Sequence, residues 1–493
     1  MTKRWTQGLS GLLSAACLIT QPAAIYTGSH YTYDDWGKAV PAPESYRVEQ
    51  VLSGEDCGAG AFSGPEDLFV DEEGRVYVAD TGNNRIVVLD AQLRMEKEIS
   101  SVALPEGDSP LLEPKGVFRT PEGELYICDT GNGRILQLDK DDRYVRTYTR
   151  PETSLLSDDL AFQPEKVAVD SGGAVYVVAY GIYQGLVEYG PDGSFTGFFG
   201  SNQVELTLEV LVSYFWKQLL SKEQGEALTR TIPTQYANVF IDDQDFLYTA
   251  TSETETSTDE VKKLNALGVN VLRSAEGQEL YDKSNFADLE TDQQKGLAVD
   301  SRVVDVHVDE DGIISLLDQR RGRIFQYNED RQLLFVFGNL GEQAGTFSRV
   351  TALSKLGDRY LVLDGDNHTL TLFGMTGYAA RLREAMGYYT EGRYAESVEL
   401  WQALLTENSQ LSVAYQSIGK ALVQQQRYEE AMTYFEKGND REGYSNALRE
   451  YRKGWIRANS GWLLAVAAAL WIGVTVLRRI WKKRRARRRG PTG

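Results

Sequence analysis

The stretch YVADTGNNRIVVLD, Tyr77 to Asp90, returns 49 residues later as YICDTGNGRILQLD, Tyr126 to Asp139. In each copy, two short runs rich in aliphatic and β-branched residues flank a turn whose glycine and asparagine tolerate positive φ. Each copy therefore predicts a β-hairpin. A further apolar run ending in a glycine-containing turn precedes each copy, and another extended piece follows it. The sequence thus predicts repeating units of about four strands.

Weaker copies continue along the chain and bring the number of units to six. The equivalent positions, at the end of the first hairpin strand, are Asp80, Asp129, Ala179, Thr251, Asp318 and Asp364. Four-stranded units that recur every 40 to 50 residues or so are typical of a β-propeller, in which ring closure protects the sheet edges. We expect a mainly β fold with a six-bladed propeller over residues 45–375. The segment Ser45–Leu52 would supply the strand that closes the ring against unit six.

The pattern from Pro65 to Ile86 closely resembles the NHL repeat, and the second unit, through Ile135, resembles it nearly as well. The resemblance covers roughly residues 45–375. It is strong in units one and two, fair in five and six, and poor in three and four, which lack the Asp and the Arg. It implies an NHL-type propeller. The segment YTYDDWGKAVPAPESY, residues 31–46, also resembles the start of uncharacterised bacterial surface proteins that combine such repeats with C-terminal helices and one membrane span.

The beginning of the chain has the layout of a secretory signal peptide. Lys3 and Arg4 precede a short apolar run, and small residues follow it, so residues 1–28 are expected to be a cleaved signal and residues 29–44 a linker. The alternative is an uncleaved anchor, but the apolar run is shorter than the ~20 residues that a membrane span needs.

The other end predicts a membrane anchor. Residues 461–477 are uncharged and apolar, and nine Lys and Arg crowd positions 478–489 directly after them. By the positive-inside rule, this arrangement predicts a single-pass cell-membrane protein with its N-terminus outside and a basic cytoplasmic tail over residues 478–493.

The charge balance excludes one class of partner. Removing the nine basic tail residues, Lys3 and Arg4 from the 52 Lys and Arg leaves 41 against 71 Asp and Glu, so the exported part carries about −30. Such an acidic surface argues against nucleic acid as a partner. After signal cleavage only Cys57 and Cys128 remain, so one disulfide at most can form; we favour two free thiols.

Two regions have a helical period. Residues 204–231 interrupt the propeller with an amphipathic pattern, which predicts either a lid or a docking surface. Within residues 376–459, GRYAESVELWQALL and QRYEEAMTYFEKG align with a shift of 34, the tetratricopeptide period. Because such an array normally needs three or more repeats, it is expected to lean on the propeller or on another protein. Candidate partner-docking residues are Phe215, Trp216, Tyr394, Trp401, Tyr428 and Phe435.

Several charged residues recur at fixed blade positions. They are Asp80, Arg85, Asp129, Arg134, Asp318, Arg323 and Asp364. Recurrence in every good copy indicates architecture, with an acidic acceptor and an arginine donor holding the hairpin turn. These residues are therefore predicted to be structural.

The sequence favours binding over catalysis. The chain has only three histidines, at scattered positions, so a three-His zinc site is not expected. No catalytic residue or cofactor is assigned. We expect a membrane-anchored extracellular scaffold whose propeller recognises a protein, peptide or glycan and whose helical repeats organise a complex near the membrane. The alternative is a metal-dependent lactonase- or lyase-like enzyme, with a divalent cation held by Glu66, Asp67, Glu165, Asp305 and His307.

Overall fold

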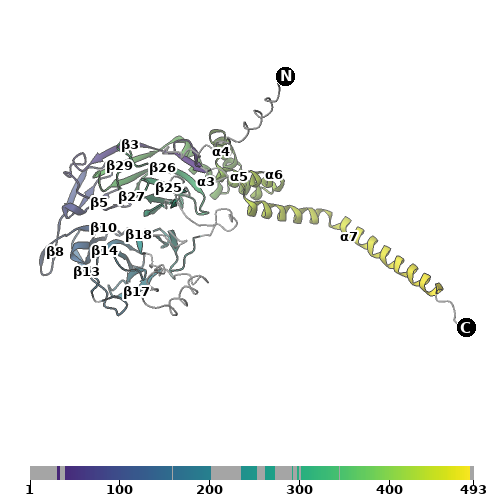
Figure 1. The fold of residues 1–493 in the computed structure, drawn as a ribbon, viewed down its shortest axis with the longest axis horizontal. Helices are drawn as coiled ribbons and strands as arrows, with labels where there is room; N and C mark the ends of the chain where they lie inside the picture. The colour runs from purple at the N-terminus through teal and green to yellow at the C-terminus, as the bar shows by residue number, and fades with distance from the viewer. Residues whose placement is uncertain are drawn as a thin grey trace, which may run out of the picture.

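The computed structural model describes residues 30–33, 39–157, 159–200, 235–251, 261–272, 291–292, 297–298, 301–343 and 345–488. The expected signal peptide and the expected helical insertion over residues 204–231 lie outside these ranges. In Figure 1 the propeller lies at one end of the molecule, a group of helices packs beside it, and one long helix extends away.

Six antiparallel sheets form the propeller, and the first strand of each lies beside the central channel. Blade 1 contains β4 (Asp67–Val70), β5 (Val76–Asp80), β6 (Arg85–Leu89) and β7 (Met95–Ile99). Blade 2 contains β10 (Pro114–Arg119), β11 (Leu125–Asp129), β12 (Arg134–Leu138) and β13 (Tyr144–Tyr148). Blade 3 contains β14 (Pro164–Val169), β15 (Val175–Ala179), β16 (Leu186–Tyr189) and β17 (Phe195–Phe199).

The second half of the ring repeats this order. Blade 4 has three described strands, β18 (Tyr236–Ile241), β19 (Leu247–Thr251) and β20 (Val261–Leu264). Blade 5 contains β23 (Val303–Val308), β24 (Ile314–Asp318), β25 (Arg323–Tyr327) and β26 (Leu333–Phe337), and blade 6 begins with β27 (Val350–Leu356), β28 (Arg359–Asp364) and β29 (Thr369–Met375). Short two-stranded sheets are β8 (Ser101–Leu104) with β9 (Gly107–Pro110), and β21 (Thr291–Asp292) with β22 (Leu297–Ala298).

The predicted ring closure is confirmed. Strand β3 (Tyr46–Ser53) pairs antiparallel with β29, so the segment before the first unit is the fourth strand of blade 6. The buried Tyr46 ring packs 4.5 Å from Phe337 and 5.4 Å from Tyr360. Joining the two ends of the ring in one sheet removes two free strand edges.

The hairpin turns explain why the TGN sequence recurs. Thr81–Asn83 and Thr130–Asn132 form single 3₁₀ turns, and the next residue, Asn84 or Gly133, has a φ of 55° or 65°. Asparagine and glycine are the residues that adopt this left-handed conformation most readily. The turn thereby brings the second and third strands of blades 1 and 2 into register.

Part of the range expected to be a linker, residues 29–44, is described and forms two paired strands. Strand β1 (Tyr31–Tyr33) pairs with β2 (Ala39–Pro41), and β1 packs on β26 of blade 5. The Arg323 guanidinium lies 4.9 Å from the centre of the buried Tyr31 ring and donates to its hydroxyl at 3.1 Å. The aromatic side chain thus holds the N-terminal segment on the propeller.

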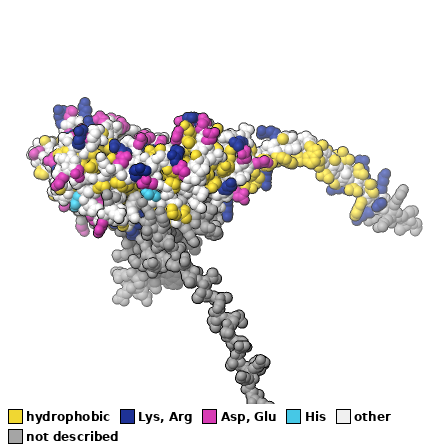
Figure 2. Space-filling view, turned by 90° about the horizontal axis from the view of Figure 1, so that it is seen from above, with side chains coloured by type: hydrophobic (Ala, Val, Ile, Leu, Met, Phe, Trp, Pro, Cys, Tyr) yellow, Lys and Arg dark blue, Asp and Glu magenta, His cyan; other side chains and the backbone are white. Residues whose placement is uncertain are grey.

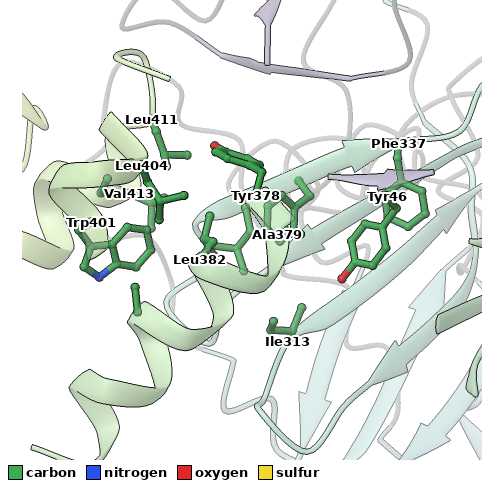
Figure 3. Close-up of a cluster of buried hydrophobic side chains, with 14 of the residues drawn as sticks. Tyr46, Ile313, Phe337, Tyr378, Ala379, Leu382, Trp401, Leu404, Leu411 and Val413 are labelled. Carbon is green, nitrogen blue, oxygen red and sulfur yellow. The ribbon is translucent and has the colours of Figure 1, made fainter. Parts of the chain in front are cut away.

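The C-terminal region contains five helices: α3 (Gly377–Thr390), α4 (Tyr394–Glu407), α5 (Ser412–Gln424), α6 (Tyr428–Lys437) and α7 (Arg441–Arg488). We call α3 to α6 the helical array. Figure 3 shows α3 side chains, including Tyr378 and Leu382, between Tyr46 and Phe337 of the propeller and Trp401 of α4. The array and the propeller therefore share one hydrophobic core, as expected if so short an array is not stable alone.

Helix α7 is 48 residues long, which corresponds to about 72 Å. It contains a stretch long and apolar enough to cross a membrane, and the side chains of this stretch are exposed. Figure 2 shows the apolar band along the helix, followed by Lys and Arg side chains. The chain thus carries one candidate single-pass anchor within its described residues. Elsewhere, Cys57 and Cys128 are free, buried thiols, and burial raises the pKa of both.

Candidate functional site

A cavity of about 1280 Å³ occupies the propeller channel, and we call it the funnel. Residues from the first strands of all six blades line it. Because residues two apart on a strand point to the same face, the strand pairings place equivalent residues of the six blades in three successive layers. At ~3.3 Å per residue, the first and third layers lie roughly 13 Å apart.

The layers differ in chemistry. The floor layer consists of Asp67, Gly116, Lys166, Asn238, Asp305 and Ala352. Two residues further along each strand, the belt layer consists of Phe69, Phe118, Ala168, Phe240, His307 and Ser354. Two residues beyond these, the rim layer consists of Asp71, Thr120, Asp170, Asp242, Asp309 and Leu356. The funnel therefore has a charged floor, a largely aromatic belt and an acidic rim.

On the floor, a lysine of blade 3 reaches a carboxylate of blade 1. The Lys166 ammonium contacts the Asp67 carboxylate and donates to the Glu66 carbonyl at 3.2 Å. Burial lowers the pKa of Lys166, but the nearby carboxylates, with Asp67 foremost, raise it above its ordinary value. Blade 2, between blades 1 and 3, has Gly116 at its floor position. A Cβ on this residue would lie 2.4 Å from the Glu165 carbonyl oxygen of blade 3. This close approach of blades 2 and 3 requires glycine.

The second floor carboxylate, Asp305, is held by neutral donors. It accepts from the backbone N–H groups of Val306 at 2.7 Å and Leu353 at 2.6 Å, and from the side-chain amide of Asn238. Asp305 is only 4% exposed, and burial raises its pKa to about 7. Within the described part of the chain, no Lys or Arg forms an ion pair with it. The floor thus has two carboxylates and one ammonium.

The belt has two aromatic walls. Phe69 and Phe118 have ring centres 5.0 Å apart, and on the opposite side of the ring Phe240 lies 4.9 Å from His307. All four side chains are partly exposed and line the funnel. Burial lowers the pKa of His307 to about 4, so the imidazole is neutral at pH 7. The belt therefore offers uncharged aromatic surface.

Most rim aspartates accept hydrogen bonds from the turn that follows their own strand. One Asp71 oxygen accepts from the backbone of Glu73 and Arg75 at 3.0 and 2.8 Å, and the other accepts from the Tyr77 hydroxyl at 3.1 Å. Blade 3 repeats the contact with Asp170 and Tyr176 at 3.0 Å. These carboxylates are thus engaged in forming the turns of their blades.

Blade 5 departs from this arrangement. Ser315 stands where the repeat has tyrosine, and the Tyr360 hydroxyl of blade 6 donates to Asp309 at 3.2 Å instead. Arg383 of α3 forms ion pairs with Asp309 at 2.8 Å and Asp311 at 2.5 Å, and Lys355 of blade 6 lies 3.7 Å from Asp309. The α3 residues Met386, Gly387 and Thr390, and Glu391 directly after the helix, also line the funnel. The helical array therefore forms part of the funnel wall.

The recurring charged residues lie away from the described funnel lining. Arg85 pairs with Asp80 at 2.8 Å and Arg134 with Asp129 at 2.7 Å, while the other carboxylate oxygen accepts from the loop N–H of Ser63 or Leu112. In blade 5, Asp318 accepts from the backbone of Arg302 and Arg320, and Arg323 contacts Tyr31. In blade 6, Asp364 accepts from the backbone of Ser348, Arg349, Asp366 and Asn367.

The five candidate metal ligands are not brought together. Asp67, Asp305 and His307 line the funnel, but Glu66 pairs with Arg349 at 3.1 Å and Glu165 pairs with Lys115 at 2.9 Å. Among the residues that the structure describes, no group of three or more His, Cys, Asp or Glu has a geometry suited to a metal ion.

Two of the proposed docking residues are corrected. Trp401 and Phe435 are 1% and 2% exposed and belong to the core of the helical array, because aromatic residues at this spacing fill the space between paired helices. Tyr394 and Tyr428 are half-buried, whereas Phe215 and Trp216 lie outside the described residues. The aromatic belt and Arg383 were not predicted. The recurrence of phenylalanine two residues after the floor position was the available signal.

The family model for the NHL repeat matches residues 62–89. No curated protein matches the chain. Among solved structures, similar chains include a catalytically inactive virginiamycin B lyase from Staphylococcus aureus with quinupristin (10% identity, 67% of this chain and 100% of that chain, TM-score 0.41). Others are the calcium-binding protein regucalcin from Agrobacterium tumefaciens (14%, 63% and 88%, 0.37) and the extracellular domain of a putative one-component system from B. thetaiotaomicron (13%, 63% and 33%, 0.33). Similarities this distant assign no ligand or reaction.

Proposed function

We propose that this protein is a membrane-anchored extracellular binding and scaffold protein. Its funnel takes part of a protein, peptide or glycan at the cell surface, and its helices organise a complex next to the membrane. The observation that supports this best is the position of α3, which lines the funnel and belongs to the same packed core as the start of the candidate membrane helix. A ligand in the funnel would touch α3, which shares a packed core with the start of α7.

The attachment of the array supports this coupling. The Asp309 side chain is fully buried beneath Arg383, and Lys420 of α5 pairs with Asp330 of blade 5 at 2.6 Å. The shared hydrophobic cluster runs from Tyr46 of the propeller to Ala447 of α7. Such a body transmits a displacement at the funnel because packed cores resist continuous deformation.

The finer reading of the array is also a proposal. The 34-residue shift places Arg393 and Arg427 at equivalent positions directly before α4 and α6, which supports a tetratricopeptide-like array. Because Trp401 and Phe435 are buried, a partner would contact the outer surface around Tyr394 and Tyr428. The basic residues that follow the apolar stretch of α7 support an external position for propeller and array.

A metal-dependent lactonase- or lyase-like enzyme is the second candidate. It is favoured by one observation, that Asp67, Asp305 and His307 face the same funnel. The ion pair between Asp67 and Lys166 weighs against it, because a cation already neutralises one of the carboxylates. Divalent-cation-dependent turnover that is lost in Asp305→Asn would favour the enzyme.

The decisive experiment compares in-cell crosslinking and mass spectrometry of the full-length protein with two variants. Gly387→Trp places a bulky side chain at the funnel mouth, where a Cβ meets no neighbouring atom. Gly454→Trp makes the same change at an equally open position on α7, away from the funnel, and is the matched control. We expect Gly387→Trp alone to lose a stoichiometric partner. Identical partners in all three samples would contradict the proposal.

A further inference from the structure

One acceptor position of the Asp305 carboxylate has no donor among the described residues. A carboxylate offers about four acceptor positions, and three described donors reach Asp305. Asn238 and Val306 share Oδ1, whereas Leu353 N–H alone donates to Oδ2. Oδ2 is therefore the oxygen with a free acceptor position.

The charge on Asp305 also lacks a direct counterion. The charged groups facing it across the floor are Lys166 and Asp67, which bind each other, and the other groups that contact it are the Asn238 amide and two backbone N–H groups. An ionised carboxylate that is buried without a paired cation is costly. A cationic ligand group at Oδ2 would remove this cost.

The belt above the floor favours the same kind of ligand. The faces of Phe69, Phe118 and Phe240 can contact a methylene chain and attract a cation through their π electrons. The chain already makes such a contact at the rim, where the Lys263 ammonium lies 4.3 Å from the Phe246 ring centre. Exposed acids at the funnel mouth, Glu72, Asp243 and Asp358, add a field that attracts cations.

We infer that the funnel contains a subsite for an alkylammonium group, such as the lysine side chain of a peptide. Asp305 accepts from the ammonium at the floor, and the belt surrounds its methylene chain. The inference rests on the proposed function, because it takes the funnel as the ligand site. It adds that the ligand is cationic at its buried end.

The test uses the full-length protein in nanodiscs of neutral lipid and two probes of equal length, 1,5-diaminopentane and 1,5-pentanediol, by isothermal titration calorimetry. We expect the diamine to bind at least about tenfold more tightly than the diol, because a hydrogen bond to a charged group is replaced by a neutral one. Asp305→Asn should remove this preference. Asp108→Asn, at an exposed position of the β8–β9 hairpin, should leave it unchanged.

The pH profile provides a readout that does not depend on how well a variant folds. Because the pKa of Asp305 is about 7 in the empty site, raising the pH from 6 to 8 should tighten diamine binding about tenfold as the carboxylate ionises. Equal affinity for diamine and diol, a flat pH profile, or undiminished diamine binding in Asp305→Asn would overturn the inference. Asp305-dependent binding of Ca²⁺ or Mn²⁺ without selectivity for the amine would overturn it in favour of a metal site.

The two proposals fail separately. If Gly387→Trp loses its crosslinked partner but the wild-type protein shows no amine preference, the funnel remains the ligand site and the alkylammonium subsite is wrong. If the diamine binds as expected but all three proteins keep the same partners, the subsite stands and the scaffold role of the funnel is wrong.

Discussion

Blades 1 and 5 are built on the same repeat but differ at the tyrosine position and in the contacts of the recurring arginine and the rim aspartate. In blade 1, the Tyr77 hydroxyl donates to the rim aspartate Asp71, and Arg85 forms an ion pair with Asp80. Both contacts lie within the blade. Blade 5 has Ser315 in place of the tyrosine, and its Arg323 contacts the N-terminal hairpin. Its rim aspartate, Asp309, pairs with Arg383 of α3, whereas the floor aspartates of both blades are bound by other elements. The departures from the repeat mark where additional segments attach to the ring.

The largest effect should follow from removing the arginine that occupies the modified rim of blade 5. Arg383→Ala removes the closest cation from the buried Asp309 and leaves only Lys355, at 3.7 Å, so the cost should be about 3 kcal/mol, the lower end for breaking a buried ion pair. We expect a lower thermal midpoint and faster amide exchange in α3. Arg381→Ala is the control, because its ion pair with Glu407 is half-exposed and should contribute about 1 kcal/mol or less. Equal effects of the two variants would show that α3 is not anchored at blade 5.

The floor aspartate of blade 5 should make the stability of the protein depend on pH. The pKa of Asp305 rises from the ordinary 3.8 to about 7 on folding, so the folded state binds the proton more tightly than the unfolded state. This contribution to stability is fully present below pH 4 and is lost as the pH rises to 7. We expect the stability advantage of the wild type over Asp305→Asn to shrink by roughly 2 to 4 kcal/mol across this window.

Thermal unfolding from pH 4 to 8 measures this difference. Asp108→Asn, which changes an exposed carboxylate, serves as the control and should show a constant difference from the wild type. A constant difference for Asp305→Asn as well would mean that its carboxylate titrates alike in the folded and unfolded chains.

Introducing the repeat tyrosine at Ser315 of blade 5 should destabilise the protein. Ser315 is fully buried and lies 3.3 Å from the Tyr360 hydroxyl, so Ser315→Tyr overfills the site at a cost of about 1 to 3 kcal/mol. We expect hydrogen exchange to increase in α3, because the new ring competes for the space of Tyr360 and Arg383. Ser315→Ala keeps the space and is the control; unchanged protection of α3 in Ser315→Tyr would refute the role of this position.

The sequence predicts the ring well because blade formation depends on local sequence patterns. Strand, turn and spacing recur within each unit, and the closing strand is a short extended segment directly before the first one. Contacts across the channel do not recur. Lys166 contacts Asp67 from 99 positions away, and Arg383 of α3 pairs with Asp309 of blade 5. Trp401 and Phe435 were misassigned to a surface because periodicity shows which residues share a helix face but does not show what covers that face.

The smallest expected effect distinguishes the arginines at equivalent positions in the two blades. Arg85 donates to Asp80, Glu98 and the Ala59 carbonyl, all at 2.8 Å, so Arg85→Lys loses a planar set of contacts and should cost about 2 kcal/mol. Arg323→Lys loses the stacking on Tyr31 and weakens the hydrogen bond to its hydroxyl, and should cost about 1 kcal/mol.

The two lysine variants should also differ in where they loosen the protein. Limited proteolysis should detect release of the N-terminal hairpin in Arg323→Lys, because the Tyr31 contact attaches the hairpin to blade 5, whereas Arg85→Lys should leave it protected. Equal costs and equal protection would mean that Arg323 still serves the repeat, as Arg85 does. A hairpin released only in Arg323→Lys would mean that blade 5 has exchanged a contact within the repeat for one that attaches a separate segment.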